Sequence, residues 1–206
     1  MTRVIWNKST KYAYIFCEWK TEESYFNQLS RILNIRWVTV KTIDLEWWTK
    51  IMNNPELIKK KIISTVKHNN PKLKWLVPKI FIVFDLDIFI DKVKLDNTLN
   101  ILKDYKLIVS NETFEYWILS HFKKYNLWKW KYNYLIELKS FLPWLPNMPD
   151  LKTYKMTWRN NFEWMTSDNI KNAIKNINEI NKLSKWNLKD RDPYSNVNEI
   201  IDFLLL

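Results

Sequence analysis

Four acidic side chains stand at or just after the ends of apolar runs that predict β-strands: Glu18, Asp85, Asp87 and Glu115. In open α/β sheets, ligand sites form at the carboxyl ends of the strands. Carboxylates gathered at such an edge can hold Mg²⁺ (or Mn²⁺), a hard cation that prefers oxygen ligands. A bound ion of this kind stabilises charge on a phosphoryl group, and a nearby glutamate can act as general acid or base. The pattern therefore predicts metal-assisted catalysis by these four residues.

Each of these residues also has an ordinary structural explanation. An aspartate at a strand end often serves as a turn or capping residue, and Asp-x-Asp arises by chance. Among the neighbours, Lys20 is a candidate contact for phosphate, whereas Cys17 is expected to be a small buried residue. His121 is expected to make a structural hydrogen bond. The joint pattern of a glutamate after one strand and Asp-x-Asp after a later one is more specific than any single carboxylate.

The elements that must position these residues follow from the periodicity of the chain. Strands are predicted over residues 11–17, 37–43, 79–85 and 105–110, and helices over 21–33, 55–67, 95–103 and 113–122. Thr21 is expected to cap the first helix. The third strand is apolar almost throughout, as in a central parallel strand that is covered on both faces. Strands alternating with helices predict an α/β fold with a mainly parallel sheet flanked by helices.

The pattern changes in the last part of the chain. Residues 125–160 contain aromatic residues, three prolines and little periodicity, and helices are predicted over 167–183 and 195–204. We therefore expect an α/β core over residues 8–124, with a C-terminal helical extension over 125–206 packed on it.

The composition of the 206-residue chain favours a polyanionic partner. It carries 33 basic and 22 acidic residues, a net charge of +11, which suits DNA or RNA. No apolar stretch is long enough to cross a membrane, and the N-terminus has no signal-peptide pattern. The single cysteine excludes an intramolecular disulfide and a cysteine-cluster zinc site. A cytoplasmic protein that binds nucleic acid is expected.

The chain contains no glycine and 13 tryptophans. Several of these tryptophans, such as Trp19, Trp158 and Trp186, stand where a tight turn would favour glycine. The codon UGA is read as tryptophan in one genetic code and as glycine in another. We therefore predict that most of these positions are glycine in the native protein, with Trp117 an exception because it lies in an apolar helix pattern. A deliberately substituted chain, or a protein truly rich in tryptophan, is the alternative.

Four blocks of the chain resemble motifs of one known family, the RloB-like proteins. Residues 16–26 are similar to its Cys-Glu-Gly-x-Thr-Glu-x-x-Tyr-Phe motif, and residues 82–87 to its Phe-Asp-x-Asp strand. Residues 110–122 resemble Ser-Asn-Pro-x-Phe-Glu-x-Trp-Leu-x-x-His-Phe, and residues 192–197 resemble Asn-Pro-x-Thr-x-Val. The blocks occur in the same order and span about residues 11–205. The chain departs from the motifs at three positions: Trp19 replaces glycine, Glu112 replaces proline, and Ile88 replaces a frequent acidic residue.

The resemblance implies a Toprim-like fold, similar to that of topoisomerases, primases and related nucleases. It implies metal-dependent phosphodiester chemistry, with Glu18 as general acid or base and with Asp85 and Asp87 binding Mg²⁺. It further implies a role in a restriction-associated phage-defence system, together with a protein partner encoded nearby. One alternative is a non-catalytic module that binds nucleic acid or a protein. Nucleotide hydrolysis is another, but no Gly-x-x-x-x-Gly-Lys-Ser/Thr motif exists even when Trp is read as Gly.

The glycine hypothesis predicts the mass of the protein isolated from its natural source. We expect the intact mass to fall well below the 25.4 kDa of the written sequence, because each replacement removes an indole side chain. Intact mass spectrometry measures this directly, and peptide mapping identifies the positions. A mass that matches 13 tryptophans would overturn the hypothesis.

Overall fold

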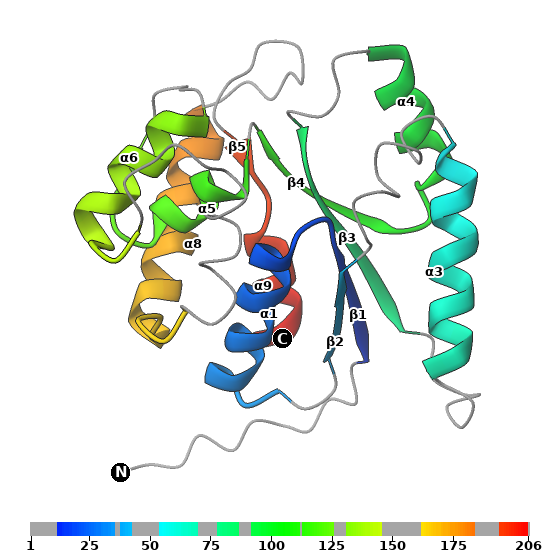
Figure 1. Cartoon of the computed structure of the whole chain (residues 1–206), viewed down its shortest axis with the longest axis horizontal. Helices are drawn as coiled ribbons and strands as arrows, with labels where there is room; N and C mark the ends of the chain where they lie inside the picture. Colours follow the sequence, from blue (N-terminus) through cyan, green and yellow to red (C-terminus); the bar gives the residue numbers. More distant parts are fainter. Residues whose placement is uncertain are drawn as a thin grey trace.

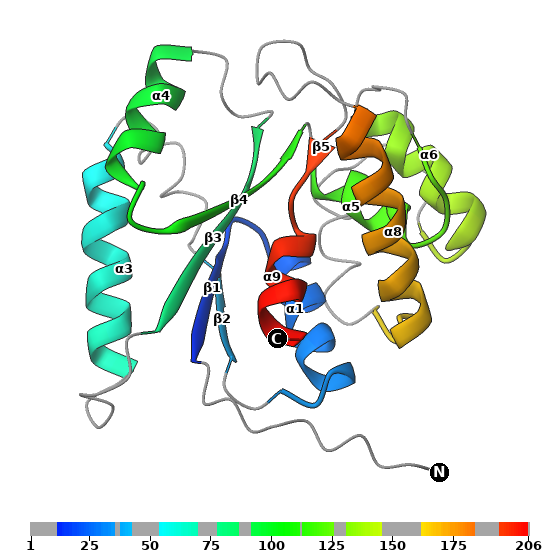
Figure 2. The same cartoon turned by 180° about the vertical axis from the view of Figure 1, so that it is seen from behind.

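A computed structural model describes most of the chain as a sheet that is covered by helices on both faces (Figures 1 and 2). The described residues are 12–35, 38–42, 54–69, 78–86, 92–111, 113–125, 131–145, 162–183 and 194–205.

The sheet has five strands in the order β2-β1-β3-β4-β5. Their bounds are β1 Ala13–Cys17, β2 Val38–Thr42, β3 Lys79–Asp85, β4 Lys106–Asn111 and β5 Tyr194–Ser195. The first four strands run parallel, and β5 pairs antiparallel with β4 at the edge. This arrangement confirms the predicted mainly parallel α/β fold, and it is consistent with a Toprim-like fold.

The helices divide between the two faces of the sheet. One face is covered by α3 (Pro55–Asn69) and α4 (Lys92–Ile101). Helices α1, α5, α8 and α9 lie on the other side, with α6 packed on the outside of α5 (Figures 1 and 2). The bounds of the second group are α1 Lys20–Ile32, α5 Phe114–Ser120, α6 Lys131–Phe141, α8 Ser167–Leu183 and α9 Asn198–Leu205. None of the helices in the described ranges has both the length and the apolar content to span a bilayer.

The two-residue period of the strands separates two hydrophobic cores. In β1, Ala13, Ile15 and Cys17 pack on the α1 side of the sheet, whereas Tyr14 and Phe16 pack on the α3 side. Successive side chains of a strand point to opposite faces, so a strand buried on both faces must be apolar throughout. The larger core also contains Ile177 and Ile200 from the C-terminal part of the chain. Buried residues of the predicted α/β core (8–124) and of the predicted C-terminal extension (125–206) therefore pack in the same hydrophobic core.

Most predicted elements match the structure to within a few residues, but one expectation at the start of α1 was wrong. Thr21 does not cap α1, because the helix already begins at Lys20 and its N-cap is Trp19. The backbone of Trp19 is extended (φ −119°, ψ 162°), so this position does not require glycine. The positive φ recorded among the described residues belongs to Asn34 (φ 52°), just after the end of α1. Trp158 and Trp186 lie outside the described residues.

Two elements of the C-terminal part were not predicted. Helix α6 lies in the stretch that showed little periodicity, and it packs on α5. Strand β5 consists of Tyr194 and Ser195, whereas the sequence predicted a helix that begins at residue 195. The C-terminal part is therefore not helical alone, since it contributes the edge strand of the sheet.

Asn196 extends the contact between β5 and β4 with its side chain. Its Oδ1 accepts a hydrogen bond from the Val109 backbone N–H at 2.7 Å, and its Nδ2 donates to the Leu107 carbonyl at 3.1 Å. The Asn196 backbone N–H also donates to the Val109 carbonyl at 3.2 Å. The amide thereby satisfies backbone groups of β4 beyond the short β5 strand.

Replacing Asn196 by alanine should destabilise the protein by about 3 kcal/mol, because two backbone groups of β4 would lose their partners inside the fold. Urea unfolding at neutral pH measures the change. Asn172→Ala, at an exposed position of α8, is the matched control and should change the free energy of unfolding by less than about 0.5 kcal/mol. Equal effects of the two substitutions would contradict this role of Asn196.

Candidate functional site

Glu18 and Asp85 form a buried carboxylate pair at the carboxyl ends of β1 and β3. Glu18 directly follows β1, and Asp85 is the last residue of β3. Their exposed fractions are 1% and 3%. The Glu18 Oε2 accepts a hydrogen bond from the Asp85 backbone N–H at 3.3 Å. Two of the predicted site residues are thus brought together, although they are 67 positions apart in the chain.

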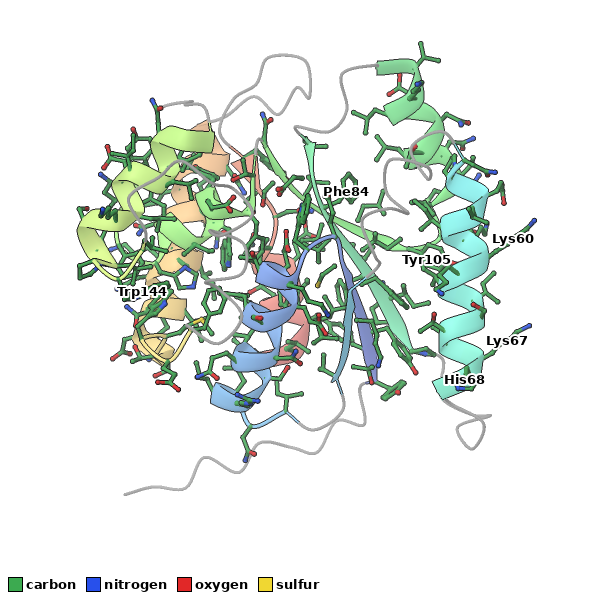
Figure 3. The ribbon with its side chains drawn as sticks, viewed as in Figure 1. Lys60, Lys67, His68, Phe84, Tyr105 and Trp144 are labelled. Carbon is green, nitrogen blue, oxygen red and sulfur yellow. The ribbon has the colours of Figure 1, made fainter. Side chains whose placement is uncertain are left out.

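The topology of the sheet explains why these two residues meet. The register pairs Cys17 of β1 with Val83 of β3, so the residues that follow in each strand reach the same edge side by side. From β1 the chain moves to β2 on one side and then to β3 on the other. The strand order therefore reverses between β1 and β3, and open α/β sheets bind ligands at such a switch point. Phe84, which precedes Asp85, marks this end of β3 in Figure 3.

The chemistry of this edge fits a hard divalent cation. Two carboxylates buried next to each other are costly while both are ionised, and a bound cation offsets that cost. The hydroxyl groups of Ser110 and Ser195 add further oxygen atoms nearby, since Ser110 is the β4 partner of Asp85. Their oxygens lie 3.1 Å apart. Within the described ranges, no three His, Cys, Asp or Glu side chains form a metal site by themselves. Asp87, which was predicted as a metal ligand together with Glu18 and Asp85, lies outside those ranges.

Glu115 lies in the first turn of α5, shortly after β4. It is 4% exposed, and its carboxylate accepts a hydrogen bond from the Thr113 hydroxyl. Thr113 in turn accepts from the Glu115 backbone N–H at 3.1 Å and caps the helix. Glu115 is therefore buried at the same end of the sheet as the carboxylate pair. Its hydrogen bonds with Thr113 stabilise the N-terminus of α5.

Glu22 is a further acidic residue of this region that the sequence analysis did not select as a site residue. It lies in the first turn of α1, four residues after Glu18 in the chain, and is 1% exposed. The sequence analysis considered its position at the helix start but not its burial. The four-residue spacing from Glu18 was the available signal, because residues so spaced can share a side of the chain. Glu22 adds a third buried carboxylate next to the end of β1.

Cys17 and Lys20 flank Glu18 and differ sharply in environment. The Cys17 thiol is fully buried, as expected, and burial raises its pKa well above 9.0, with further increases from the charges of Glu22 and Glu23. A thiol in this state is a poor nucleophile. The Lys20 side chain is 52% exposed and pairs with Glu23 one turn further along α1. Lys20 therefore lies at the surface, while Glu18 points inward.

A buried network joins α1 to α5 behind the carboxylates. The Tyr25 hydroxyl lies 3.0 Å from His121 Nε2, and His121 Nδ1 lies 3.1 Å from the carbonyls of Trp117 and Ile118. These carbonyls accept the Nδ1 proton, so Nε2 accepts from the tyrosine. Burial lowers the pKa of His121 to about 4, which keeps the ring neutral. The predicted structural role of His121 agrees with these contacts, and Trp117 is fully buried beside it, as its apolar pattern indicated.

Comparisons with known proteins identify one family. The family model described as RloB-like protein matches residues 13–204, nearly the whole chain. No curated protein and no solved structure matches the chain.

The neutral, buried His121 predicts a loss of stability in mild acid. Unfolding exposes the imidazole and returns its pKa from about 4 to about 6.5, so the unfolded state binds a proton that the folded state excludes. The contribution of the neutral His121 to the free energy of unfolding is complete above about pH 6.5 and is lost as the pH falls toward about 4. The free energy of unfolding should therefore fall by about 2 kcal/mol between about pH 7.5 and pH 5. Urea unfolding at both pH values measures it.

The matched control is the other histidine, His68, which is exposed on α3. His121→Gln should remove about 2 kcal/mol of the pH dependence, whereas His68→Gln should leave it unchanged. The same pH dependence in both variants would show that His121 is not the responsible group.

Proposed function

Because the chain belongs to the RloB-like protein family, we propose that it is a metal-dependent nuclease with the Glu18–Asp85 pair at the centre of its active site. One observation carries the proposal. A buried glutamate accepts a hydrogen bond from the backbone of a buried aspartate at the switch point of a parallel sheet. Structural carboxylates can lie anywhere on a fold, but ligand sites of such sheets concentrate at this point.

The proposed roles follow from the chemistry of the side chains. Asp85 would hold Mg²⁺ or Mn²⁺, with Asp87 as a second ligand on the basis of the sequence pattern. The ion would neutralise charge on the phosphoryl group and make bound water more acidic. Glu18, held in place by the Asp85 backbone, would transfer the proton as general acid or base. Glu115 and Glu22 are buried nearby and would add negative charge that favours the cation.

The proposed substrate is nucleic acid, DNA or RNA, in agreement with the net charge of +11. We further propose that the protein acts in the cytoplasm in a restriction-associated defence system against phage. A protein partner would contribute to the choice of substrate, because a single small domain offers little surface for it. The Toprim-like arrangement is part of the same proposal, supported by the mainly parallel sheet and the position of Glu18 and Asp85.

A non-catalytic binding module is the second candidate. It is favoured by the recorded hydrogen bonds of the acidic residues, since Glu18 bonds to the Asp85 backbone and Glu115 to Thr113. In this alternative the carboxylates hold strand and helix ends together, and the protein binds nucleic acid or a partner without turnover.

Asp85→Asn should abolish metal-dependent cleavage, because the substitution removes the charge that holds the cation while keeping the size of the side chain. Plasmid DNA, single-stranded DNA and tRNA are incubated with Mg²⁺ or Mn²⁺, and Mn²⁺ binding is measured by calorimetry. Glu18→Gln should retain metal binding and lower the cleavage rate on the order of 10²–10⁴-fold, the usual contribution of a general acid or base.

The control is Asp96→Asn, at an exposed position of α4, which should cleave like the wild type. Cleavage that survives Asp85→Asn would move the active site elsewhere. A folded wild type that neither binds metal nor cleaves would leave the binding module as the function.

A further inference from the structure

Helix α3 is the most basic of the described helices. Its 15 residues contain four lysines, Lys59, Lys60, Lys61 and Lys67, and one carboxylate, Glu56. By comparison, the 17 residues of α8 contain three lysines and two carboxylates. Since α3 also buries Ile58 and Ile62 against the sheet, its basic residues are restricted to the sides and the outer face.

Lys60 and Lys67 lie on the outer face of this helix. They are seven residues apart, which is two turns and about 10 Å along the axis, so they lie on one face. Figure 3 shows both side chains extending away from the sheet. Lys59 is paired with Asp104 at 3.1 Å. By contrast, neither Lys60 nor Lys67 forms an ion pair with a carboxylate of the described residues.

Several lysines on the other side of the molecule are paired with carboxylates. Lys124 pairs with Glu179 at 2.9 Å, and Lys171 pairs with Asp168 at 3.2 Å. Lys106 and Lys123 pair in the same way with Glu199 and Glu137. Among the described helices, α3 therefore has the largest excess of lysines over carboxylates.

We propose that the outer face of α3, defined by Lys60, Ser64 and Lys67, contacts the phosphate backbone of a DNA duplex. This inference deepens the proposed function and rests on it, because it supplies the surface that holds the substrate of the Glu18–Asp85 site. Lysine side chains on an exposed helix are typical phosphate contacts, which fix the position of a duplex without reading its sequence. Ser64 lies between the two lysines, and its hydroxyl donates to the Lys61 carbonyl at 2.9 Å.

The side chains of α3 favour a duplex over a single strand. Proteins that bind single strands add aromatic side chains on which unpaired bases stack. Helix α3 has no phenylalanine, tyrosine or tryptophan side chain. Its exposed surface carries lysines and Ser64, beside the partly exposed Ile63 and with His68 near its C-terminal end.

The path of α3 connects this face to the proposed active site. As the crossover between β2 and β3, the helix starts at the carboxyl end of the parallel strands (Figure 1), and Lys60 lies nearer to that end than Lys67 does (Figure 3). A duplex held along α3 therefore extends toward the edge that carries Glu18 and Asp85.

The test is a salt titration of binding with EDTA present, so that no cleavage is required. The full chain and a Lys60→Gln/Lys67→Gln variant bind a labelled DNA duplex, followed by fluorescence anisotropy. The slope of log K against log salt should become shallower by about 2 in the variant, since each lost phosphate contact removes about 0.9. Lys60→Arg/Lys67→Arg should retain the wild-type slope, and circular dichroism confirms that each variant is folded.

The matched control, Lys171→Gln/Lys175→Gln, removes two charges from exposed positions of α8 and should leave the slope nearly unchanged. Equal losses in the two double variants would mean that only the net charge matters and would overturn the inference. No loss in the α3 variant, or no binding of the duplex by the wild type, would do the same. A larger loss for single-stranded DNA or for an RNA duplex than for duplex DNA would overturn the assignment of the ligand.

Failure of the proposed function is distinguishable from failure of this inference. Asp85→Asn should bind the duplex with the wild-type slope, because the α3 face is intact. Binding that depends on α3 without any metal-dependent cleavage would reject the nuclease and retain the surface. Cleavage with binding that is independent of Lys60 and Lys67 would reject the surface alone.

Discussion

The parallel pairing of β1 with β3 is the constraint on which the rest of the structure depends. It joins two strands that are separated by a whole βα unit, and it brings Glu18 next to the Asp85 backbone. The apolar side chains of both strands fill the cores on the two faces of the sheet, so a shift in register would move them out of place together. The position of the carboxylate pair is therefore stabilised by the entire core, and not by the pair itself.

Hydrogen bonds between uncharged groups join α1 and α5 next to the carboxyl ends of β1 and β3. Tyr25 of α1 donates to His121 of α5, whose ring also bonds to the backbone of its own helix. Glu18 lies two residues before α1 and Glu115 lies in the first turn of α5, so the contact joins the two helices that follow these acidic positions. A neutral tyrosine–histidine contact suits this place, because a charged pair would add to the field of the buried carboxylates.

The sequence predicted the elements that periodicity controls, and it failed where tertiary contacts decide. The four parallel strands were predictable because a strand buried on both faces, such as β3, is apolar without interruption. Helix α6 was missed because it packs among other helices and has no simple amphipathic stripe. Strand β5 is too short to have a period, and only its pairing with β4 makes it a strand. In the site, Glu18 and Asp85 were predictable from strand ends, whereas Ser195 and the burial of Glu22 depend on contacts between distant segments.

The attachment of β5 to β4 has a consequence for the order of events during synthesis. Ser195 and Asn196 contact residues that lie more than 80 positions earlier in the chain. Closing such a large loop is slow compared with local helix formation. During synthesis, β5 also leaves the ribosome after every other described element except α9. Until then the β4 backbone has an open edge, which can recruit a foreign strand. The nascent protein is thus most exposed to misassembly just before its sheet is complete.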